Sequence, residues 1–138
     1  MSSFLDVPGW ALPLARRILY FWVRTTVFPE QLQELGLDPA KPVCYVLQHS
    51  HLSNMLVLSE ETRRAGLPLA AAAFNAGQVK SPLSILYLNR NSNLTATARE
   101  RYAPSQLMTD LVHCAFAQPD CDVQLVPVVI LWGRRPDK

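Results

Sequence analysis

The sequence of this chain predicts an α/β fold in which a mostly parallel or mixed sheet is flanked by helices, with an amphipathic helix at the N-terminus. Short apolar runs typical of buried strands recur along the chain, the first at residues 43–47 and the clearest at 123–132. Stretches with helical periodicity separate these runs. Because strands joined by helices return in the same direction, at least part of the sheet should be parallel.

Residues 10–28 come nearest to a membrane-spanning pattern, but three arginines interrupt them. No uncharged apolar stretch reaches about 18 residues and no small-residue cleavage site follows an apolar core, so we expect neither a transmembrane helix nor a signal peptide. On a helical period the arginines fall near one side, and apolar residues cover most of the rest. The candidate membrane-binding residues of this segment are Trp10, Arg16, Arg17, Phe21, Trp22 and Arg24.

This N-terminal helix has two interpretations that the pattern alone does not separate. In the first, the helix lies in a membrane interface, where its arginines reach anionic headgroups and its Trp and Tyr rings sit at the boundary. In the second, it packs on the core of the protein itself. The sequence accordingly divides into residues 1–33, which we expect at a membrane surface, and an α/β domain at residues 34–138.

The first half of the α/β domain contains one strand and one helix with clear boundary signals. A segment rich in Gly and Pro precedes the strand at residues 43–47. A helix is predicted at residues 53–65, where apolar residues recur on one side and Arg63 and Arg64 suit the negative end of the helix dipole. Gly66 should end this helix in the left-handed conformation.

The second half of the domain alternates in the same way. Residues 69–74 and 83–88 are strand candidates, although the alanine run in the first is equally compatible with a helix. A helix is predicted from Ser105, a good N-cap, to Pro119, which should end it. Pro127 lies inside the last apolar run and indicates an edge strand or a bulge.

Composition excludes several classes of function. The chain has 138 residues, which fits one domain with a proper core. Its net charge of +2 and its lack of basic runs interleaved with aromatics predict no nucleic-acid partner. Cys44, Cys114 and Cys121 are odd in number and lack metal-site spacing, so we expect no disulfide framework, no zinc site and a reducing compartment. Without a Gly-rich phosphate loop or a Gly-x-Ser-x-Gly elbow, neither a nucleotide cofactor nor a serine hydrolase is expected.

The most informative motif directly follows the first strand, where four residues separate His49 from Asn54. An imidazole stands where the strand should end, and an amide stands at the start of the next helix. This spacing resembles the His-x4-Asp site of glycerolipid acyltransferases, with an amide in place of the carboxylate. In that family the His is a general base, and the carboxylate orients the imidazole and stabilises its positive charge. The alternative is an ordinary His at a strand end, satisfied by backbone and solvent.

Longer segments extend the resemblance. Residues 34–38, 42–47 and 122–134 resemble the N-terminal region of the bacterial membrane-bound glycerol-3-phosphate 1-O-acyltransferases. The last segment is the most specific, because Asp-Val-Gln followed by Val-Pro-Val and then Gly-Arg is an unusual combination. The similarity runs from about Glu34 to the last residue. It implies that the chain is the opening portion of a longer enzyme whose catalytic domain comes later.

The sequence blocks of the acyltransferase superfamily are matched unequally. The first survives as His49 with Asn54, and the second resembles residues 84–90, which makes Arg90 a candidate phosphate-binding residue. The fourth resembles the Val-Pro-Val at residues 126–128. The third, an acidic-Gly pair that helps to hold glycerol-3-phosphate in the family, has no counterpart. The resemblance therefore implies a degenerate acyltransferase-like domain.

The function implied by the resemblance is acyl transfer from acyl-CoA or acyl-carrier protein to carbon 1 of glycerol-3-phosphate in phospholipid biosynthesis. The implied location is peripheral, on the cytoplasmic side of the bacterial inner membrane. Because Asn54 carries no charge, and a comparable Asp→Asn change in a serine protease costs roughly 10⁴ in rate, we expect this chain alone to be inactive. Two alternatives stay open: a non-catalytic membrane-interface scaffold, and a self-sufficient acyltransferase that uses His49.

Overall fold

The computed structural model of the chain describes residues 11, 13, 14, 17, 25–27, 32–89, 105–119 and 121–133. Among these residues, no helix combines the length and the apolar character needed to span a bilayer. Their helices and strands, in chain order, are the 3-10 helix η1 (Leu32–Leu35), β1 (Val43–His49), α2 (Leu52–Arg64), β2 (Phe74–Ala76), β3 (Val79–Ser81), β4 (Ile85–Asn89), α4 (Gln106–Ala117) and β5 (Gln124–Val128).

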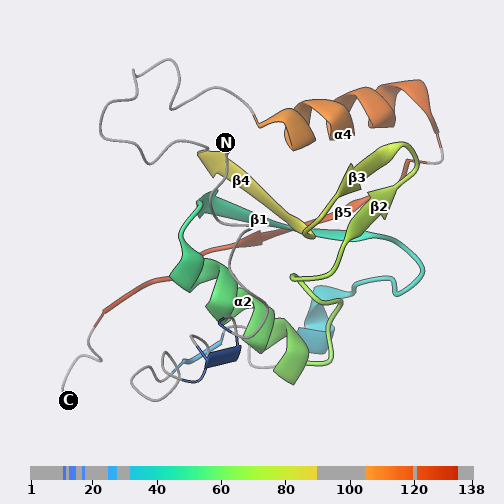
Figure 1. Cartoon of the computed structure of the whole chain (residues 1–138). Coiled ribbons are helices and arrows are strands. Elements are labelled where there is room, and N and C mark those ends of the chain that lie inside the picture. Colours follow the sequence, from blue (N-terminus) through green and yellow to red (C-terminus); the bar gives the residue numbers. More distant parts are fainter. Residues whose placement is uncertain are drawn as a thin grey trace, which may run out of the picture.

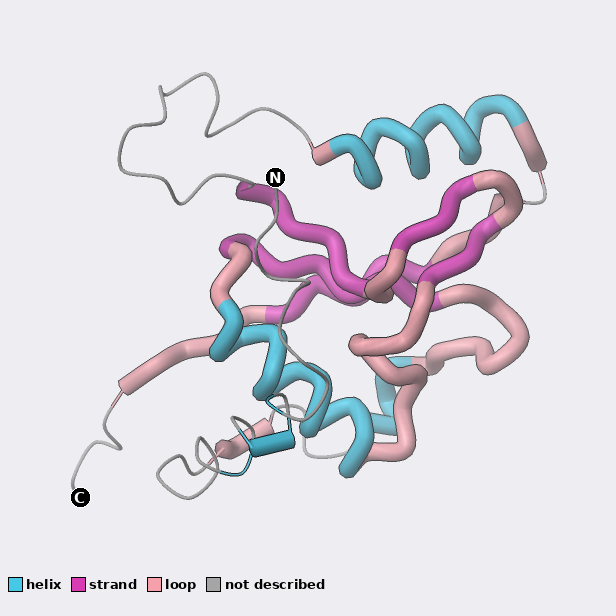
Figure 2. The backbone as a smooth tube through the Cα atoms, viewed as in Figure 1, coloured by secondary structure: helices cyan, strands magenta, loops and turns pink. Residues whose placement is uncertain are grey.

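Three strands form a parallel sheet in the order β4, β1, β5, so the strand that comes first in the chain is the central one. Tyr45 of β1 is opposite Ile85 of β4 on one side and Val126 of β5 on the other. Helix α2 lies on one face of the sheet and α4 on the other (Figure 1). The backbone in Figure 2 has the same layers, and the α/β prediction with a parallel sheet is confirmed.

The face of the sheet that α2 covers has a continuous core. Side chains alternate along a strand, and the odd-numbered residues Val43, Tyr45 and Leu47 of β1 are buried against Leu58 of α2. The hydroxyl of Tyr45 donates a hydrogen bond to the carbonyl of Pro68 at 2.7 Å, so this buried polar group is satisfied. Partly buried side chains from both outer strands and from neighbouring segments complete the cluster: Leu37, Met55, Leu83, Tyr87, Val126, Val128 and Ile130.

The opposite face of the sheet is covered by α4 and by the antiparallel hairpin of β2 and β3. Cys44, an even-numbered residue of β1, is fully buried there with Phe74 and Cys114. The hairpin turns at Gly77, whose φ is +59°. A Cβ at Gly77 would meet the Oε1 atom of Gln118 at 3.0 Å, so a glycine lets the hairpin tip approach the end of α4 closely.

The strand expected at residues 69–74 is wrong, because β2 begins only at Phe74. Ala70 is completely buried in a loop, where its carbonyl accepts the N–H of Ser84 at 3.1 Å. The alanines of this stretch lack the branched or aromatic side chains that favour strands, and the helical alternative is not found either. The hairpin that follows was not expected from the sequence.

Apart from η1, which was not predicted, the other elements agree with the sequence to within a few residues. Strand β1 extends to His49, and Gly66 follows α2 with a φ of +67°. Ser105 caps α4 as expected, because its hydroxyl accepts the N–H of Met108 at 3.2 Å. Strand β5 is shorter than the apolar run and ends at Val128.

Cys114 and Cys121 form a disulfide, so the expectation of no disulfide is wrong. Cys114 lies in the last turn of α4, and Cys121 follows a turn in which its N–H donates to the carbonyl of Gln118 at 3.1 Å. This turn places the two Cα atoms 5.9 Å apart. A reversal of the chain, rather than any sequence spacing, creates the pair. The free cysteine, Cys44, is buried.

Pro127 lies on an edge strand of the sheet, as its position in the sequence predicts. Gln124 donates its N–H to the carbonyl of Pro42 at 2.9 Å, on the β1 side. Because the direction of hydrogen bonding alternates along a strand, Gln124 and Val126 bond to β1, whereas Leu125 and Pro127 direct their backbone groups away from it. The missing N–H of Pro127 therefore faces outward and removes no bond from the sheet.

Most of the N-terminal segment lies outside the described residues. Those that are described between positions 11 and 17 have helical backbone conformation, and the side chain of Arg17 is exposed. Further along, the hydroxyl of Thr25 donates to the Oε1 atom of Glu61 at 2.7 Å, which places Thr25 beside α2. The remaining candidate membrane-binding residues fall outside the described part of the chain: Trp10, Arg16, Phe21, Trp22 and Arg24.

Candidate functional site

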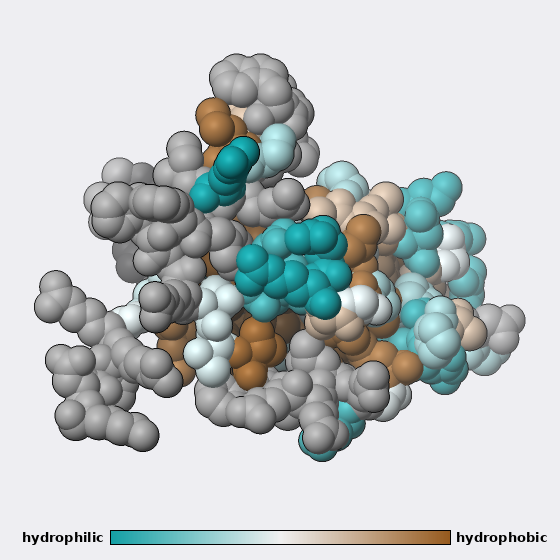
Figure 3. Space-filling view, turned by 90° about the horizontal axis from the view of Figure 1, so that it is seen from below, coloured by the Kyte–Doolittle hydropathy of each residue, from teal (hydrophilic) through white to brown (hydrophobic). Residues whose placement is uncertain are grey.

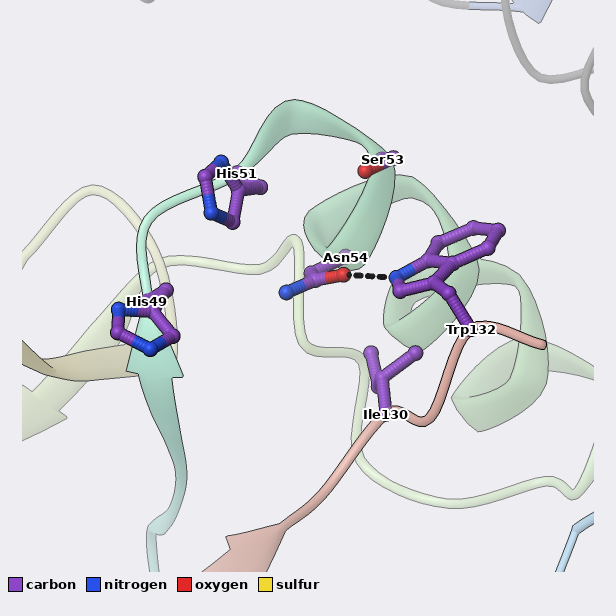
Figure 4. Close-up of a pocket in the computed structure, with 6 residues that line it drawn as sticks. All are labelled: His49, His51, Ser53, Asn54, Ile130 and Trp132. Carbon is purple, nitrogen blue, oxygen red and sulfur yellow. Dashed lines mark hydrogen bonds between the residues drawn. The ribbon is translucent and has the colours of Figure 1, made fainter. Parts of the chain in front are cut away.

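The candidate site lies at the edge of the sheet where β1 and β5 end. The carboxyl ends of parallel strands are the usual place for ligands in open α/β sheets, at the point where successive connections leave on opposite faces. Here α2 follows β1 on one face, and α4 precedes β5 on the other. An open cleft of about 410 Å³ lies at this edge (Figure 4), lined by His49, His51, Ser53, Asn54, Ile130 and Trp132.

A tight turn between β1 and α2 brings two histidines to the cleft. The N–H of His51 donates to the carbonyl of His49 at 3.1 Å, and the rings of these residues lie 5.9 Å apart between centroids. His51 is the N-cap of α2, with an extended backbone and no side-chain capping bond. Both imidazoles are exposed. The turn therefore presents two exposed rings at the start of a helix.

The orientation of the Asn54 side chain is set by Trp132. The Nε1 atom of Trp132 lies 2.8 Å from the Oδ1 atom of Asn54. An indole N–H is a donor only, so the Asn54 atom that faces it must be the oxygen, which accepts. The amide nitrogen of Asn54 is then directed to the side of the cleft where His49 and His51 stand (Figure 4).

This orientation has the wrong polarity for a catalytic pair of the His-Asp type. A general-base His needs an acceptor for the N–H of its second ring nitrogen, which fixes the tautomer and stabilises the imidazolium. Asn54 directs a donor toward the imidazoles, because its acceptor is engaged by Trp132. No hydrogen bond joins His49 to Asn54 within the described residues. The structure thus brings the two residues to one cleft without building a general base from them.

The remaining sequence candidates are only partly gathered at this edge. Asn89, the last described residue of β4, is the register partner of His49, and Arg90 itself lies outside the described residues. The Val-Pro-Val of residues 126–128 forms part of β5, beside β1. Residues 84–89 include all of β4, so the second block of the resemblance maps to the other neighbour of β1.

Arg63 and Arg64 lie at the far end of α2 and take no part in the cleft. The Nη2 atom of Arg63 and the Nε atom of Arg64 contact the Oε1 atom of the buried Glu60 at 2.7 and 3.1 Å. The hydrogen bond with Glu60 raises the pKa of Arg63 above its ordinary value. The face of the molecule on which α2 lies carries a compact hydrophilic cluster bordered by hydrophobic atoms (Figure 3). These arginines have a structural role at the end of a helix.

Two residues of the cleft, Ile130 and Trp132, were missed from the sequence. Both follow β5 and continue its alternation, so they fall on the same side as Val126 and Val128, which pack toward α2. The alternation of the last apolar run, together with the rule that parallel strands end at one edge, was the signal that could have placed them beside His49.

Neither a metal site nor an activated nucleophile is found in the part of the chain that the structure describes. No group of His, Cys, Asp or Glu side chains there is arranged to hold a metal ion. Burial raises the pKa of the Cys44 thiol to about 11, so this group stays protonated and unreactive near neutral pH. Burial also raises the pKa of the Tyr45 hydroxyl, to about 12. These groups belong to the core.

Comparison with known proteins identifies the family. The protein-family model of the glycerol-3-phosphate acyltransferase PlsB N-terminal domain matches residues 11–138. The chain belongs to this family. A curated glycerol-3-phosphate acyltransferase of Pseudomonas syringae pv. syringae (strain B728a) is 35% identical over 124 residues, which are 89% of this chain and 15% of the relative. That of Pseudomonas savastanoi pv. phaseolicola (strain 1448A / Race 6) is 34% identical over 123 residues, with the same coverage.

As a PlsB N-terminal domain, the chain spans about 15% of the length of the curated relatives that it matches. No solved structure matches it. The resemblance to the N-terminal region of these acyltransferases, expected from the sequence, is confirmed. The cleft with Asn54 and Trp132 is therefore a feature of an N-terminal domain whose relatives carry a much longer polypeptide.

Proposed function

We propose that this chain serves acyl transfer to glycerol-3-phosphate as a non-catalytic N-terminal domain. In the complete polypeptide, the acyl group passes from acyl-CoA or acyl-carrier protein to the hydroxyl on carbon 1. The observation that carries the proposal is the family match over residues 11–138, because the matched relatives are named for this activity. The product of this reaction enters phospholipid biosynthesis.

The geometry of the cleft supports a non-catalytic role. A catalytic His-Asp pair would need a carboxylate that accepts from the imidazole, whereas Asn54 offers an N–H and gives its oxygen to Trp132. The charged third block of the superfamily has no counterpart in the sequence. Both observations favour chemistry in another part of the polypeptide over a self-sufficient acyltransferase that uses His49.

An acyl transfer assay tests this proposal on two proteins: the 138-residue chain, and a chimera in which the chain replaces the matching N-terminal portion of the Pseudomonas syringae relative. We expect no turnover by the chain and turnover by the chimera. His49→Ala should leave the turnover of the chimera within about twofold, because a residue outside the reacting atoms affects only folding or docking. A chain that turns over alone and loses this activity in His49→Ala would show that the cleft is catalytic.

Asn54→Asp sharpens the test. The carboxylate would be able to accept from Trp132 and from an imidazole at once, so it restores the polarity of a His-Asp pair. We expect that the chain still shows no turnover, because nothing holds the acceptor in place. Asn75→Asp is the matched control, since Asn75 is exposed on β2 and adds the same charge away from the cleft. Turnover in Asn54→Asp alone would contradict the proposal.

We further propose that residues 1–33 hold the protein at the cytoplasmic side of the bacterial inner membrane as a peripheral domain. The proposal rests on the arginines and aromatic rings of the segment. The hydrogen bond from Thr25 to Glu61 favours the alternative, in which the segment packs on α2. The two interpretations are compatible if the segment is anchored at Thr25 and the residues before Thr25 reach the lipid.

Vesicle sedimentation separates these alternatives. Binding to vesicles that contain phosphatidylglycerol should weaken as salt rises, and more so in Arg16→Glu with Arg17→Glu, because each arginine adds on the order of 1 kcal/mol near an anionic surface. Phe21→Ser with Trp22→Ser should release the protein even at low salt. If these last changes lower thermal stability and leave vesicle binding equal to wild type, the segment packs on the core and the membrane proposal fails.

A further inference from the structure

One face of β5 is apolar and uncovered. The odd-numbered residues of this strand and of the segment after it face the side of the sheet that carries α4, because they pair with the even-numbered residues of β1. Their side chains remain in solvent, with exposed fractions of 56% for Leu125, 80% for Val129 and 89% for Leu131. We call Leu125, Pro127, Val129 and Leu131 the β5 stripe.

A second apolar row lies on α4. Met108, Val112 and Phe116 recur every four residues and therefore share one side of the helix. All three are exposed, Phe116 to 89%. The residues of α4 that pack into the core, Leu107 and Leu111, lie on a different side of it. Helix α4 thus contacts the sheet with one side and presents a second apolar side outward.

The charges around these surfaces favour a protein partner over a lipid surface. Residues 123–133 contain no charged side chain, and α4 contains no Lys or Arg. The acid of α4, Asp110, accepts a hydrogen bond from the side chain of Gln106 at 2.8 Å. Lys and Arg beside apolar side chains strengthen binding to anionic membranes, and none lies within residues 123–133 or within α4 itself. Exposed apolar patches mark interaction sites, and the lack of cations within these two favours a protein partner.

The backbone of β5 argues against extension of the sheet by a second copy of this chain. Its outward edge lacks an N–H at Pro127, so an added strand would lose a hydrogen bond in the middle of the ladder. A partner must therefore contact the β5 stripe through side chains, as a helix or loop that covers the face of the sheet. Parallel sheets are normally covered on both faces, and this part of the α4 side is not.

We propose that the β5 stripe and the exposed row of α4 dock onto the remaining polypeptide of a full-length glycerol-3-phosphate acyltransferase. The matched relatives carry this polypeptide, since the chain spans about 15% of their length. The partner segment is apolar and uncharged where it meets the β5 stripe, because a buried charge there would find no counter-charge. This inference rests on the proposed function, and it adds the surface through which the domain acts.

Hydrogen–deuterium exchange tests the docking on the chain alone and on the Pseudomonas syringae chimera. Peptides that cover residues 125–133 should exchange at least about tenfold more slowly in the chimera, because a docked partner protects them. Val129→Asp with Leu131→Asp should abolish this protection and leave the chain alone as stable as wild type. Leu69→Asp is the matched control, since Leu69 is 49% exposed and precedes Ala70, which belongs to the core on the opposite face of the sheet. It should leave the protection unchanged.

A second measurement guards against a chimera that fails to fold. With Leu131→Cys, a maleimide should label position 131 quickly in the chain alone and slowly in the chimera. Cys44 reports unfolding, because it is buried and reacts only when the domain opens. An unlabelled Cys44 with a position 131 that reacts equally fast in both proteins would overturn the proposal.

Other outcomes of the exchange experiment would assign the surface to a different partner. Protection in the chain alone that disappears on dilution would assign the surface to a second copy. Protection that appears only with vesicles of phosphatidylethanolamine and phosphatidylglycerol would assign it to lipid. Acyl transfer is measured on the same chimera. A chimera that is inactive but protected would reject the proposed function and support the docking. A chimera that is active but unprotected would support the proposed function and reject the docking.

Discussion

The two faces of the β4-β1-β5 sheet are covered by other elements to different extents. On the α2 face, side chains from all three strands pack into one cluster, which β5 joins through the partly buried Val126, Val128 and Ile130. On the α4 face, the core includes residues of β1 and β4, while Leu125 and Val129 stay in solvent. One strand therefore has a buried side and a bare side.

The two faces of the sheet contribute differently to the structure. The α2 face holds the fold together through burial and also positions the cleft, since Ile130 and Trp132 extend the buried side of β5 to Asn54. The α4 face is held in part by the Cys114–Cys121 disulfide, and the odd-numbered residues of its outer strand stay exposed. The stability of the chain should therefore depend more on the α2 face than on the exposed side of β5, which the following changes test.

The largest effect should come from the α2 face. Leu47 is 1% exposed in the middle of that core, so Leu47→Ala leaves a cavity and should lower the free energy of unfolding by about 2 to 5 kcal/mol. Urea unfolding followed by far-UV circular dichroism measures it. A loss below about 1 kcal/mol would mean that the α2 face is no better packed than the bare side, and the comparison would fail.

The disulfide should have the next largest effect, on the α4 face. Cys114 and Cys121 lie seven positions apart in the sequence, and a loop of this length stabilises by about 2 kcal/mol through the entropy of the unfolded chain. Reduction with dithiothreitol should lower the free energy of unfolding by that amount. Cys121→Ser is the control, because the reductant should then change nothing. An equal effect of the reductant in this variant would point to another cause.

A smaller effect should appear in the pH dependence of stability, through the buried thiol of Cys44. Burial raises the pKa of Cys44 from 9.0 to about 11, so the unfolded chain loses this proton before the folded one does. The stabilisation is complete below pH 9 and disappears between pH 9 and 11, which amounts to about 1 kcal/mol between pH 8 and 10. Cys44→Ala should reduce this decline. Burial raises the pKa of Tyr45, on the α2 face, from 10.0 to about 12, so its contribution is lost from about pH 10 upward and overlaps only the upper part of the Cys44 range.

The smallest effect should come from the bare side. Val129 is 80% exposed, so Val129→Ala should change the free energy of unfolding of the chain by no more than about 0.5 kcal/mol. The same urea titration measures it. A loss of more than about 1 kcal/mol would place Val129 in a core of this chain and remove the contrast between the two faces.

The sequence predicted the elements whose patterns are local. Residues 43–47 of β1 are an uninterrupted apolar run, and α2 and α4 have apolar periodicity with a glycine stop or a serine cap, so their positions follow from the local sequence. Pro127 predicted an edge strand or a bulge, because a proline cannot donate in a central strand, and β5 is an edge strand.

The features that were missed depend on distant contacts. The hairpin of β2 and β3 forms because Phe74 and Val79 are buried against the sheet, not because of any alternation in the alanine run before it. The disulfide depends on the chain reversal at Gln118, and the hydrogen bond between Asn54 and Trp132 spans 78 positions. For the candidate site, the sequence supplied His49 and Asn54, and only the fold supplied the indole that orients the amide.

Pro127 has a further consequence before any partner arrives. Residues 126–131 are Val, Pro, Val, Val, Ile and Leu, an uncharged window with the β-propensity of fibril-forming segments. Stacked identical strands need a donor and an acceptor on both edges, and the outward edge of β5 lacks the donor at Pro127. Because this side of β5 is exposed, Pro127 acts as a gatekeeper against cross-β aggregation.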